Sequence, residues 1–480
     1  MHRRPRSRRS GTVAALSGLA LAVLLLMAPP LRAAPVETPP QPAGLSLPQE
    51  ESSQPLVQVG LDAAGRPRYQ GRLTLTAALD LGLRENLSVA LGGIESRMAA
   101  AETAEAAAMG RPKLSLGAVG AGGTAPMVWS APPGAEPGFL TVLPPGAVSL
   151  NATLMVPVFT GGLLAARLEA AEYSQKAAVA RAFLALRQAA RAVRTAWHAV
   201  QQARAQQEVA SWEFQQQQEL LRLAHLQLDQ GRVARVVVLR AQAEVTAAEG
   251  RRELAGAEVA AAEAELKTAL GVSVQSDFEY ESAPPEPPPQ ATEEEDLRTA
   301  LSDRPDLVAA RYALEARDRR VAQAVAEFSP QVYAMAMAER MHMGAFQGGP
   351  LEGGYQVGLG IAWPLFDGGQ RAARLERAQA QKEIGELELE RLELEVTAQV
   401  VAARARAHAA WRALELAEAE VAAASEGLRI ARLRHQAGRS IQLEILDAVA
   451  AERRARSTLA EATALAGRAR ADLLYVTGRF

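Results

Sequence analysis

The sequence contains no cysteine, and this absence removes several kinds of chemistry at once. Disulfides, thiol nucleophiles, cysteine-based zinc sites and the lipidated cysteine of bacterial lipoproteins are all excluded. The formal net charge is only −2, so the chain lacks the basic excess that binding to nucleic acid requires. Aromatic residues are only 4% of the chain, and alanine and charged residues dominate, a composition typical of long, closely packed helices.

The sequence also lacks a catalytic constellation. The six histidines show no zinc-like spacing, and no Ser/His/Asp set or glycine-rich phosphate loop is present. We therefore expect neither an enzyme nor a bound cofactor.

A long apolar run occurs only near the N-terminus, at residues 12–28. An arginine-rich segment precedes it and the small residues of LRAAP follow it, so residues 1–34 are predicted to be a signal peptide cleaved near Ala33 or Ala34. An uncleaved anchor helix is the alternative, and Arg8-Arg9 is a partial match to a twin-arginine signal. Residues 35–72 are predicted to be a flexible, proline-rich leader.

The rest of the chain contains an internal sequence repeat. Residues 156–171 (VPVFTGGLLAARLEAA) and 363–378 (WPLFDGGQRAARLERA) share ten of sixteen positions at a separation of 207. Upstream, the GRPKLSL and FSPQVYA segments match at a separation of 218. The sequence thus predicts a duplicated unit: a first repeat at 73–271, a linker at 272–293 and a second repeat at 294–480.

Each repeat is predicted to run helix, strand, strand, long helix, helix. Thr76 is the expected N-cap of the first helix, and Asp367 with Gln370 the expected capping box of the second long helix. The predicted ranges are helices 76–109, 162–229 and 233–269 with strands 113–121 and 147–158, then helices 294–328, 369–436 and 441–476 with strands 331–341 and 354–365.

The lengths of these elements constrain the architecture. A helix over 162–229 is about 100 Å long, too long for a globular domain. The shorter helices are about half that length, so two of them can stack beside one long helix. Strand 354–365 alternates apolar residues with small or polar ones, as an outer-membrane barrel does, although a soluble sheet with one buried face remains an alternative. Four strands cannot close alone, whereas three chains give twelve strands and room for a lumen.

The chain resembles the TolC-like outer-membrane efflux channels. The resemblance rests on VPVFTGG and WPLFDGG before the long helices, on RPDL at 304–307, and on the turn segments 229–242 and 436–448. It covers about residues 73–478. It implies a mainly α fold with a small transmembrane β part: a homotrimer with a twelve-stranded β-barrel in the outer membrane and a periplasmic α-helical barrel.

The resemblance also implies a function and partners. Such a channel is the passive exit duct of a tripartite efflux system, coupled through a periplasmic adaptor to an inner-membrane pump. A type I protein secretion duct uses the same tube, and a periplasmic coiled-coil scaffold without a pore is the rival outside the class. A C-terminal phenylalanine such as Phe480 can be an assembly signal for outer-membrane barrels. Here it follows a predicted helix and not a strand, so we interpret its presence at the C-terminus as coincidental.

The two helical turns are the expected adaptor-docking surface. The resemblance places them at the periplasmic tip, and glycine permits both the positive φ of such a turn and close approach of a partner helix. The alternative is that they are turn residues only. The expected docking residues are Gly231, Arg232, Val233, Gly438, Arg439 and Ser440.

Glu444 and Asp447 are the expected gate. They lie three residues apart on one face of the last helix, where the resemblance places the acids that ring the periplasmic entrance. Three copies would form a cation-favouring ring of carboxylates. Arg240, which the repeat aligns with Asp447, is expected to pair with Glu444 or Asp447 in the closed state. The alternative is an exposed acidic helix start.

Four methionines alternate in MAMAERMHMG at residues 335–344. Thioethers suit Cu(I) and Ag(I), so Met335, Met337, Met341 and Met343 define a metal hypothesis. The favoured interpretation is that they fill a barrel surface, with no metal bound.

Overall fold

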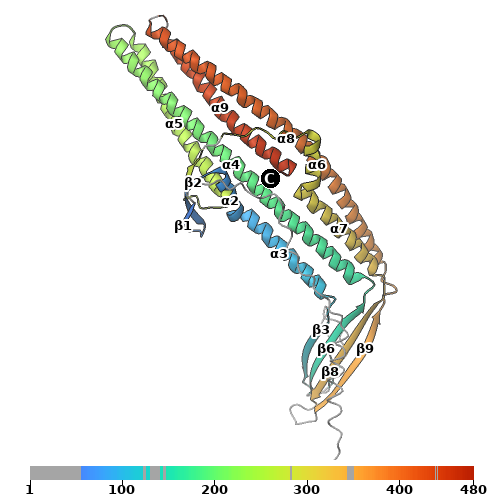
Figure 1. Ribbon diagram of the computed structural model, residues 1–480. Helices are drawn as coiled ribbons and strands as arrows, with labels where there is room; N and C mark the ends of the chain where they lie inside the picture. The colour runs from blue at the N-terminus through green and yellow to red at the C-terminus, as the bar shows by residue number, and fades with distance from the viewer. Residues whose placement is uncertain are drawn as a thin grey trace, which may run out of the picture. The chain divides into compact units, whose positions relative to one another are not determined.

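The structure is a computed structural model that describes residues 56–122, 126–129, 141–143, 147–281, 284–342, 351–437, 439 and 442–479. The expected signal peptide lies outside these residues. Figure 1 shows long helices side by side and a separate sheet of long strands.

The helices occur in two sets of equal length. The long helices α4 (Leu163–Asp229) and α8 (Gln370–Gln436) have 67 residues each, and α5 (Arg235–Leu270) and α9 (Gln442–Thr477) have 36 each. The helices α2 (Leu75–Glu85) and α6 (Glu293–Asp303) have 11 residues each, and α3 (Leu87–Ala108) and α7 (Pro305–Ala326) have 22 each. The repeat in the sequence is therefore a repeat of structure.

The structure corrects the two single helices that we expected over 76–109 and 294–328, because each is broken in two. Asn86 separates α2 from α3: its side chain accepts from the Ser88 N–H and donates to the Ala269 carbonyl, both at 2.8 Å. Arg304 separates α6 from α7 because Pro305 follows it, and a residue before proline favours extended backbone.

Two expected caps are also wrong. The N-cap of α2 is Thr74, not Thr76, and its hydroxyl accepts from the Ala77 N–H at 3.1 Å. Before α8, Gly369 is the N-cap, and Asp367 accepts from the N–H groups of Gly369 and Arg371 instead of forming a box with Gln370. The Nε of Arg371 also donates to Asp367 at 2.7 Å, and this hydrogen bond lowers the pKa of the carboxyl.

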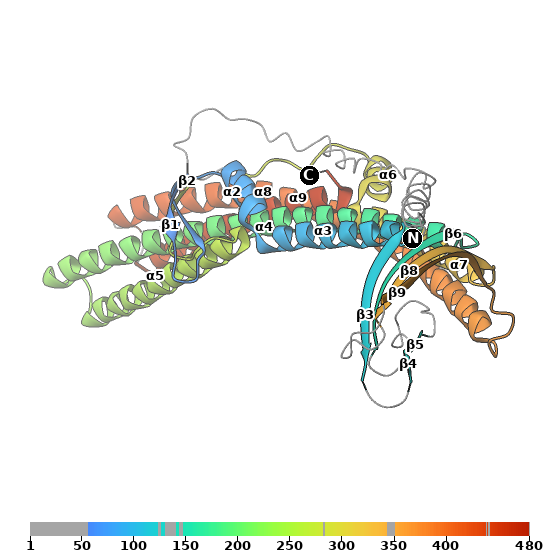
Figure 2. The same ribbon diagram turned by 90° about the horizontal axis from the view of Figure 1, so that it is seen from below.

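The helices form one layer whose order changes along the long helices. In the half nearer the long strands, contacts run α3–α4–α7–α8. In the other half they run α5–α4–α9–α8. Figures 1 and 2 show these neighbours side by side. Many of the buried side chains are alanines, among them Ala177, Ala189, Ala407 and Ala410, and small side chains let helices approach closely. Thus α4 and α8 span both halves.

Four long strands form an antiparallel sheet in the order β3-β6-β8-β9. Their bounds are β3 (Lys113–Ala121), β6 (Ala147–Phe159), β8 (Gln331–His342) and β9 (Leu351–Ala362). Two short strands, β4 (Met127–Trp129) and β5 (Thr141–Leu143), pair with each other. In the described residues, β3 and β9 are the edges of the larger sheet, and each pairs on one side only.

The larger sheet has one apolar and one polar face. Leu116, Ala152, Ala338 and Tyr355 are register partners across its four strands, as are Ser115, Thr153, Met337 and Gln356 on the other face. On the polar face, Ser149 Oγ donates to Glu339 Oε1 at 2.7 Å. No described residue covers the apolar face, where Leu116 is 83% and Leu359 74% exposed.

A second, three-stranded sheet corrects the expected leader and linker. It contains β1 (Val57–Leu61), β2 (Pro67–Leu73) and β7 (Asp277–Tyr280), so residues 57–61 and 67–73 are not a flexible leader and the linker holds a strand. β2 pairs with β7 in parallel. Leu73 and Phe278 are buried with Val193, Trp197 and Val200 of α4, so this sheet covers one face of the helical layer.

Candidate functional site

The turn between α4 and α5 has well-defined backbone geometry. Gly231 has φ +64°, and Arg232 N–H donates to the Gln227 carbonyl at 2.8 Å while Gly231 N–H donates to that of Leu228 at 2.9 Å. These two bonds satisfy the last carbonyls of α4 in the manner of a Schellman motif. Because a side chain is strained at positive φ, the turn itself requires glycine at this position.

The turn between α8 and α9 repeats part of that pattern. Arg439 N–H donates to the Arg434 carbonyl at 2.8 Å, which matches the Arg232 bond at the corresponding position. Arg232 and Arg439 are exposed and Val233 is half-buried. Gly438 and Ser440, the other expected docking residues, lie outside the described residues.

Glu444 and Asp447 are both exposed on the first turns of α9. Between and after them, Ile445 and Val449 are buried against Leu220 and Leu428, which fixes the rotation of this helix. The two carboxylates therefore share a face turned away from that core, as the spacing predicts. Arg434 Nη1 lies 3.9 Å from Glu444 Oε2, a cation that the sequence did not indicate.

Arg240 does not reach the expected partners within one chain. It is exposed on α5, whose Val238 and Ala241 are buried against Ala224 of α4. Among the described residues, no ion pair joins Arg240 to Glu444 or Asp447. A latch through Arg240 would therefore have to join two chains.

The methionines lie on the polar face of the larger sheet. In β8, Met335 and Met337 alternate with alanines, whereas Met341 lies between Arg340 and His342. All three methionines face the same way as Ser149 and Glu339. Met335 is the register partner of Met155. Met343 lies outside the described residues. No group of three or more His, Asp or Glu side chains in the described part of the chain is arranged to hold a metal ion.

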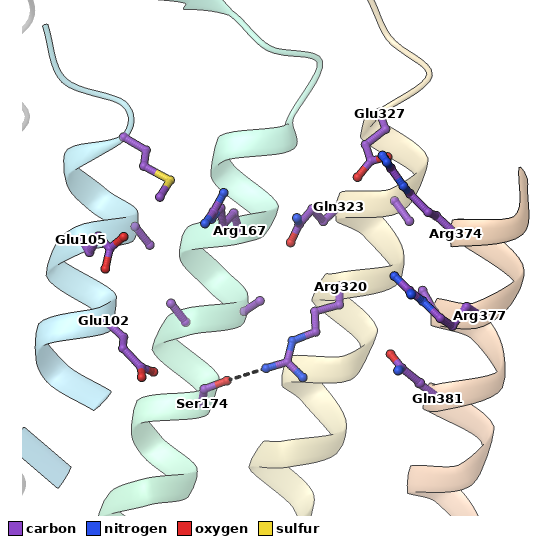
Figure 3. A pocket seen from close by; sticks show the side chains of 16 residues that line it. Glu102, Glu105, Arg167, Ser174, Arg320, Gln323, Glu327, Arg374, Arg377 and Gln381 are labelled. Atoms are coloured by element: carbon purple, nitrogen blue, oxygen red, sulfur yellow. Dashed lines mark hydrogen bonds and ion pairs between the residues drawn. The ribbon is translucent and has the colours of Figure 1, made fainter. Parts of the chain in front are cut away.

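A charged cleft of about 560 Å³ lies near the sheet ends of α3, α4, α7 and α8. Figure 3 shows Arg320 pointing toward Ser174 and Arg374 toward Glu327, with Glu102 and Glu105 on the α3 side. Arg320 Nη2 lies 3.4 Å from Ser174 Oγ, and Arg374 Nη1 lies 3.0 Å from Glu327 Oε2. We did not predict this cleft. The sequence feature that could have indicated it is the repeated AARLE, which contains Arg167 in one copy and Arg374 in the other.

Charged side chains also tie the two repeats together further along α4. Glu213 is nearly buried and bonds to Arg251 of α5, and Arg453 of α9 lies 3.3 Å from the same carboxylate. His198 packs beneath Gly467 of α9. Burial, followed by the charges of Arg194, Arg468 and Arg470, lowers the pKa of His198 to about 4, so the imidazole is neutral at pH 7.

No helix in the described ranges is both long enough and apolar enough to cross a membrane.

Comparison with known proteins identifies the family. The family described as "Outer membrane efflux protein" matches residues 139–272 and 297–479, more than half of the chain. The chain is 28% identical over 242 residues to the outer membrane efflux protein BepC of Brucella suis, covering 48% of this chain and 50% of BepC. It is 33% identical over 220 residues to protein CyaE of Bordetella pertussis, covering 43% of this chain and 46% of CyaE. Each alignment thus spans about half of the relative.

Solved structures share the fold. The outer membrane protein VceC of Vibrio cholerae superposes with a TM-score of 0.69 at 19% identity, covering 84% of this chain and 96% of VceC. The CmeC outer membrane channel of Campylobacter jejuni gives 0.72 at 15% identity, covering 90% and 93%. The expected family is confirmed: the chain belongs to the outer membrane efflux protein family, and it is an outer-membrane protein, not an enzyme.

Proposed function

We propose that three copies of this chain form the exit duct of a tripartite efflux system that exports small molecules across the outer membrane. The observation that carries this proposal is the larger sheet: among the described residues, its apolar face is bare and both of its edge strands are unpaired on one side. A sheet edge cannot face lipid unpaired, because no water is present there to satisfy its backbone groups. Pairing β9 of one chain with β3 of the next closes a twelve-stranded barrel with its apolar face to the lipid.

The helices support the same closure. Exposed apolar residues recur at heptad spacing on α3, the edge helix of the layer near the sheet. A second stripe lies on α8, the opposite edge. The stripes contain Leu87, Leu91, Ile94 and Met98 on α3, and Ile384, Leu387 and Leu394 on α8. In a trimer the α8 stripe of one chain packs against the α3 stripe of its neighbour.

The gate that we propose is a ring of Glu444 and Asp447 from three chains at the periplasmic mouth. Arg434 tethers Glu444 within each chain, and Arg240 pairs across to the acids of a neighbouring chain in the closed state. A periplasmic adaptor docks on the Gly231 and Gly438 turns and exchanges these contacts, which opens the mouth. Arg232 and Arg439, which occupy corresponding positions in the two repeats, are both exposed, and this supports such a docking surface.

Single-channel conductance in a planar bilayer tests the duct and the gate together. The variant is Glu444→Gln/Asp447→Asn, and Glu418→Gln/Glu420→Gln, two exposed acids on α8, is the matched control. We expect a small, cation-selective conductance in the wild type, and a loss of cation selectivity in the gate variant only. Arg240→Gln should raise the conductance of the closed state.

Each part of the proposal has its own contrary result. Unchanged selectivity in the gate variant discards the acidic ring and keeps the duct. Unchanged conductance in Arg240→Gln discards the latch. Absence of any current, from protein that fractionates with soluble proteins, discards the duct and favours a periplasmic scaffold.

A further inference from the structure

In the described part of the chain, α2 and β7 cover one side of the helical layer, and the α4 positions that line the charged cleft lie on the other side. Arg167 and Ser174, which line the cleft, are seven residues apart on α4, and steps of seven lead to Gln202 and Val209 in a second cavity. Val193, Trp197 and Val200 face the opposite way, under α2 and β7. If the helical layers of three chains close into a tube with an open lumen, the side covered by α2 and β7 must face outward, because these elements would otherwise fill the lumen. The cleft then faces the lumen.

Positive charge exceeds negative charge in this cleft. Four arginines line it, Arg167, Arg320, Arg374 and Arg377, against three acids. Arg374 is engaged by Glu327. In the described structure no carboxylate pairs with Arg167, Arg320 or Arg377, and Ser174 is the hydrogen-bond partner of Arg320. Glu102 and Glu105 stand apart on α3, at one side of the cleft (Figure 3).

The two repeats contribute corresponding positions to the cleft but different charges. Arg167 and Arg374 correspond at the separation of 207, and both are arginine. Glu102 and Arg320 correspond at the separation of 218, and there the charge is reversed. The second repeat therefore adds a cation where the first has an acid, and the middle of the cleft becomes cationic.

We propose that this cleft binds organic anions that carry carboxylate or phosphate groups, as a transient site on the inner wall of the duct. The guanidinium groups of Arg167 and Arg320 can each donate two parallel hydrogen bonds to a carboxylate or phosphate group, and Ser174, Gln323 and Gln381 supply further hydrogen-bonding groups. The volume suits a small organic molecule. Its location inside the duct rests on the proposed function, whereas the anion chemistry rests on the cleft alone.

Citrate is a suitable probe, and calorimetry with the purified full-length mature protein measures its binding directly. The variant is Arg167→Gln/Arg320→Gln. The control Arg97→Gln/Arg181→Gln removes two exposed arginines that line neither cavity, and Arg181 lies fourteen residues from Arg167 on the same face of α4. The titration is done at about 0.15 M salt, where charges more than roughly 8 Å apart are largely screened. Binding that persists under these conditions comes from a local site and not from the overall charge of the protein.

We expect citrate to bind the wild type and the control alike, and to bind the cleft variant at least about tenfold more weakly. Equal binding to all three proteins, equal loss in variant and control, or no binding to the wild type would overturn the proposal. The same citrate should partly block the channel current of the wild type. A protein without any current would contradict the duct, while calorimetry still decides the site.

Discussion

Arg251 of α5 donates two hydrogen bonds, 2.9 and 3.0 Å long, to the carboxylate of Glu213 on α4. The Glu213 side chain is 5% exposed, and Arg453 of α9 approaches it to 3.3 Å. One buried carboxylate thus joins three helices from both repeats. Removing one partner of a buried ion pair leaves the other charges uncompensated, and this costs more than the pair itself contributes.

We therefore predict that Glu213→Gln destabilises the helical layer by about 2 kcal/mol, since its two arginines are partly solvated. Thermal unfolding followed by far-ultraviolet circular dichroism in detergent measures the change. Glu219→Gln is the control: Glu219 pairs with Arg222 at 2.6 Å on the same helix, but both side chains are more than half exposed to water. Its loss should leave the melting temperature unchanged. Similar melting temperatures for both variants would contradict the role of burial.

His198 predicts a pH dependence of stability. Its pKa is lowered from 6.5 to about 4 by burial and by neighbouring arginines, so the unfolded chain binds the proton more tightly than the folded chain. The contribution of His198 to the free energy of unfolding is fully present above pH 6.5 and is lost as the pH falls toward 4. The total loss is up to about 3 kcal/mol.

His198→Gln should remove this part of the acid destabilisation, measured as melting temperature at pH 7, 6, 5 and 4. His225→Gln, which removes an exposed histidine of the same helix, should keep the wild-type profile. If His198→Gln and the wild type lose stability in parallel over this range, the buried imidazole is not responsible.

Gly467 is predicted to be required for the same contact. A Cβ at this position would overlap the His198 ring, so Gly467→Ala must displace either the imidazole or α9. We expect a lower melting temperature, with a cost of about 1–3 kcal/mol for overpacking. Gly427→Ala on α8 meets open space and should instead stabilise by about 0.5–1 kcal/mol, because alanine is the better helix former. Two changes of the same sign would contradict the packing argument.

The two faces of the larger sheet predict which positions tolerate substitution by a charged residue. Leu116→Arg places a cation on the face that we assign to lipid, at a cost of about 2–4 kcal/mol near the middle of the bilayer. We expect the variant to be lost from the outer-membrane fraction and to form no heat-resistant trimer on gels.

Ser115→Arg, one residue earlier and on the polar face, should assemble normally. Assembly of Leu116→Arg together with failure of Ser115→Arg would reverse the assigned faces. Normal assembly of both would argue against membrane insertion of this sheet.

Much of the fold follows from local patterns. The long helices and the four long strands lie within a few residues of the expected ranges, because helical stretches of this length and strict strand alternation are strong signals. The break at Arg304 also follows from local chemistry, since Pro305 disfavours a helical residue before it. By contrast, the break at Asn86 combines a local cap to the Ser88 N–H with a hydrogen bond to the Ala269 carbonyl, 183 residues away.

The candidate sites divide in the same way. The positive φ at Gly231 and the exposed pair Glu444 and Asp447 follow from turn chemistry and helix spacing. The partner of Glu444 did not: Arg434 reaches it across the turn from the end of α8, whereas no ion pair joins Arg240 to it among the described residues. Which of several nearby cations reaches a carboxylate depends on how the helices pack, and sequence spacing does not specify this.

By itself, the sequence determined the duplication, the family and the ranges of the main elements, because these depend on periodicity and on residues close together in the chain. Only the tertiary structure decided that residues 67–73 pair with 277–280, that Glu213 bridges three helices, and that Arg167 and Arg320 line one cleft. Each of these contacts joins segments far apart in the sequence. Their geometry depends on helix rotation and strand pairing, which are set by packing of the whole layer.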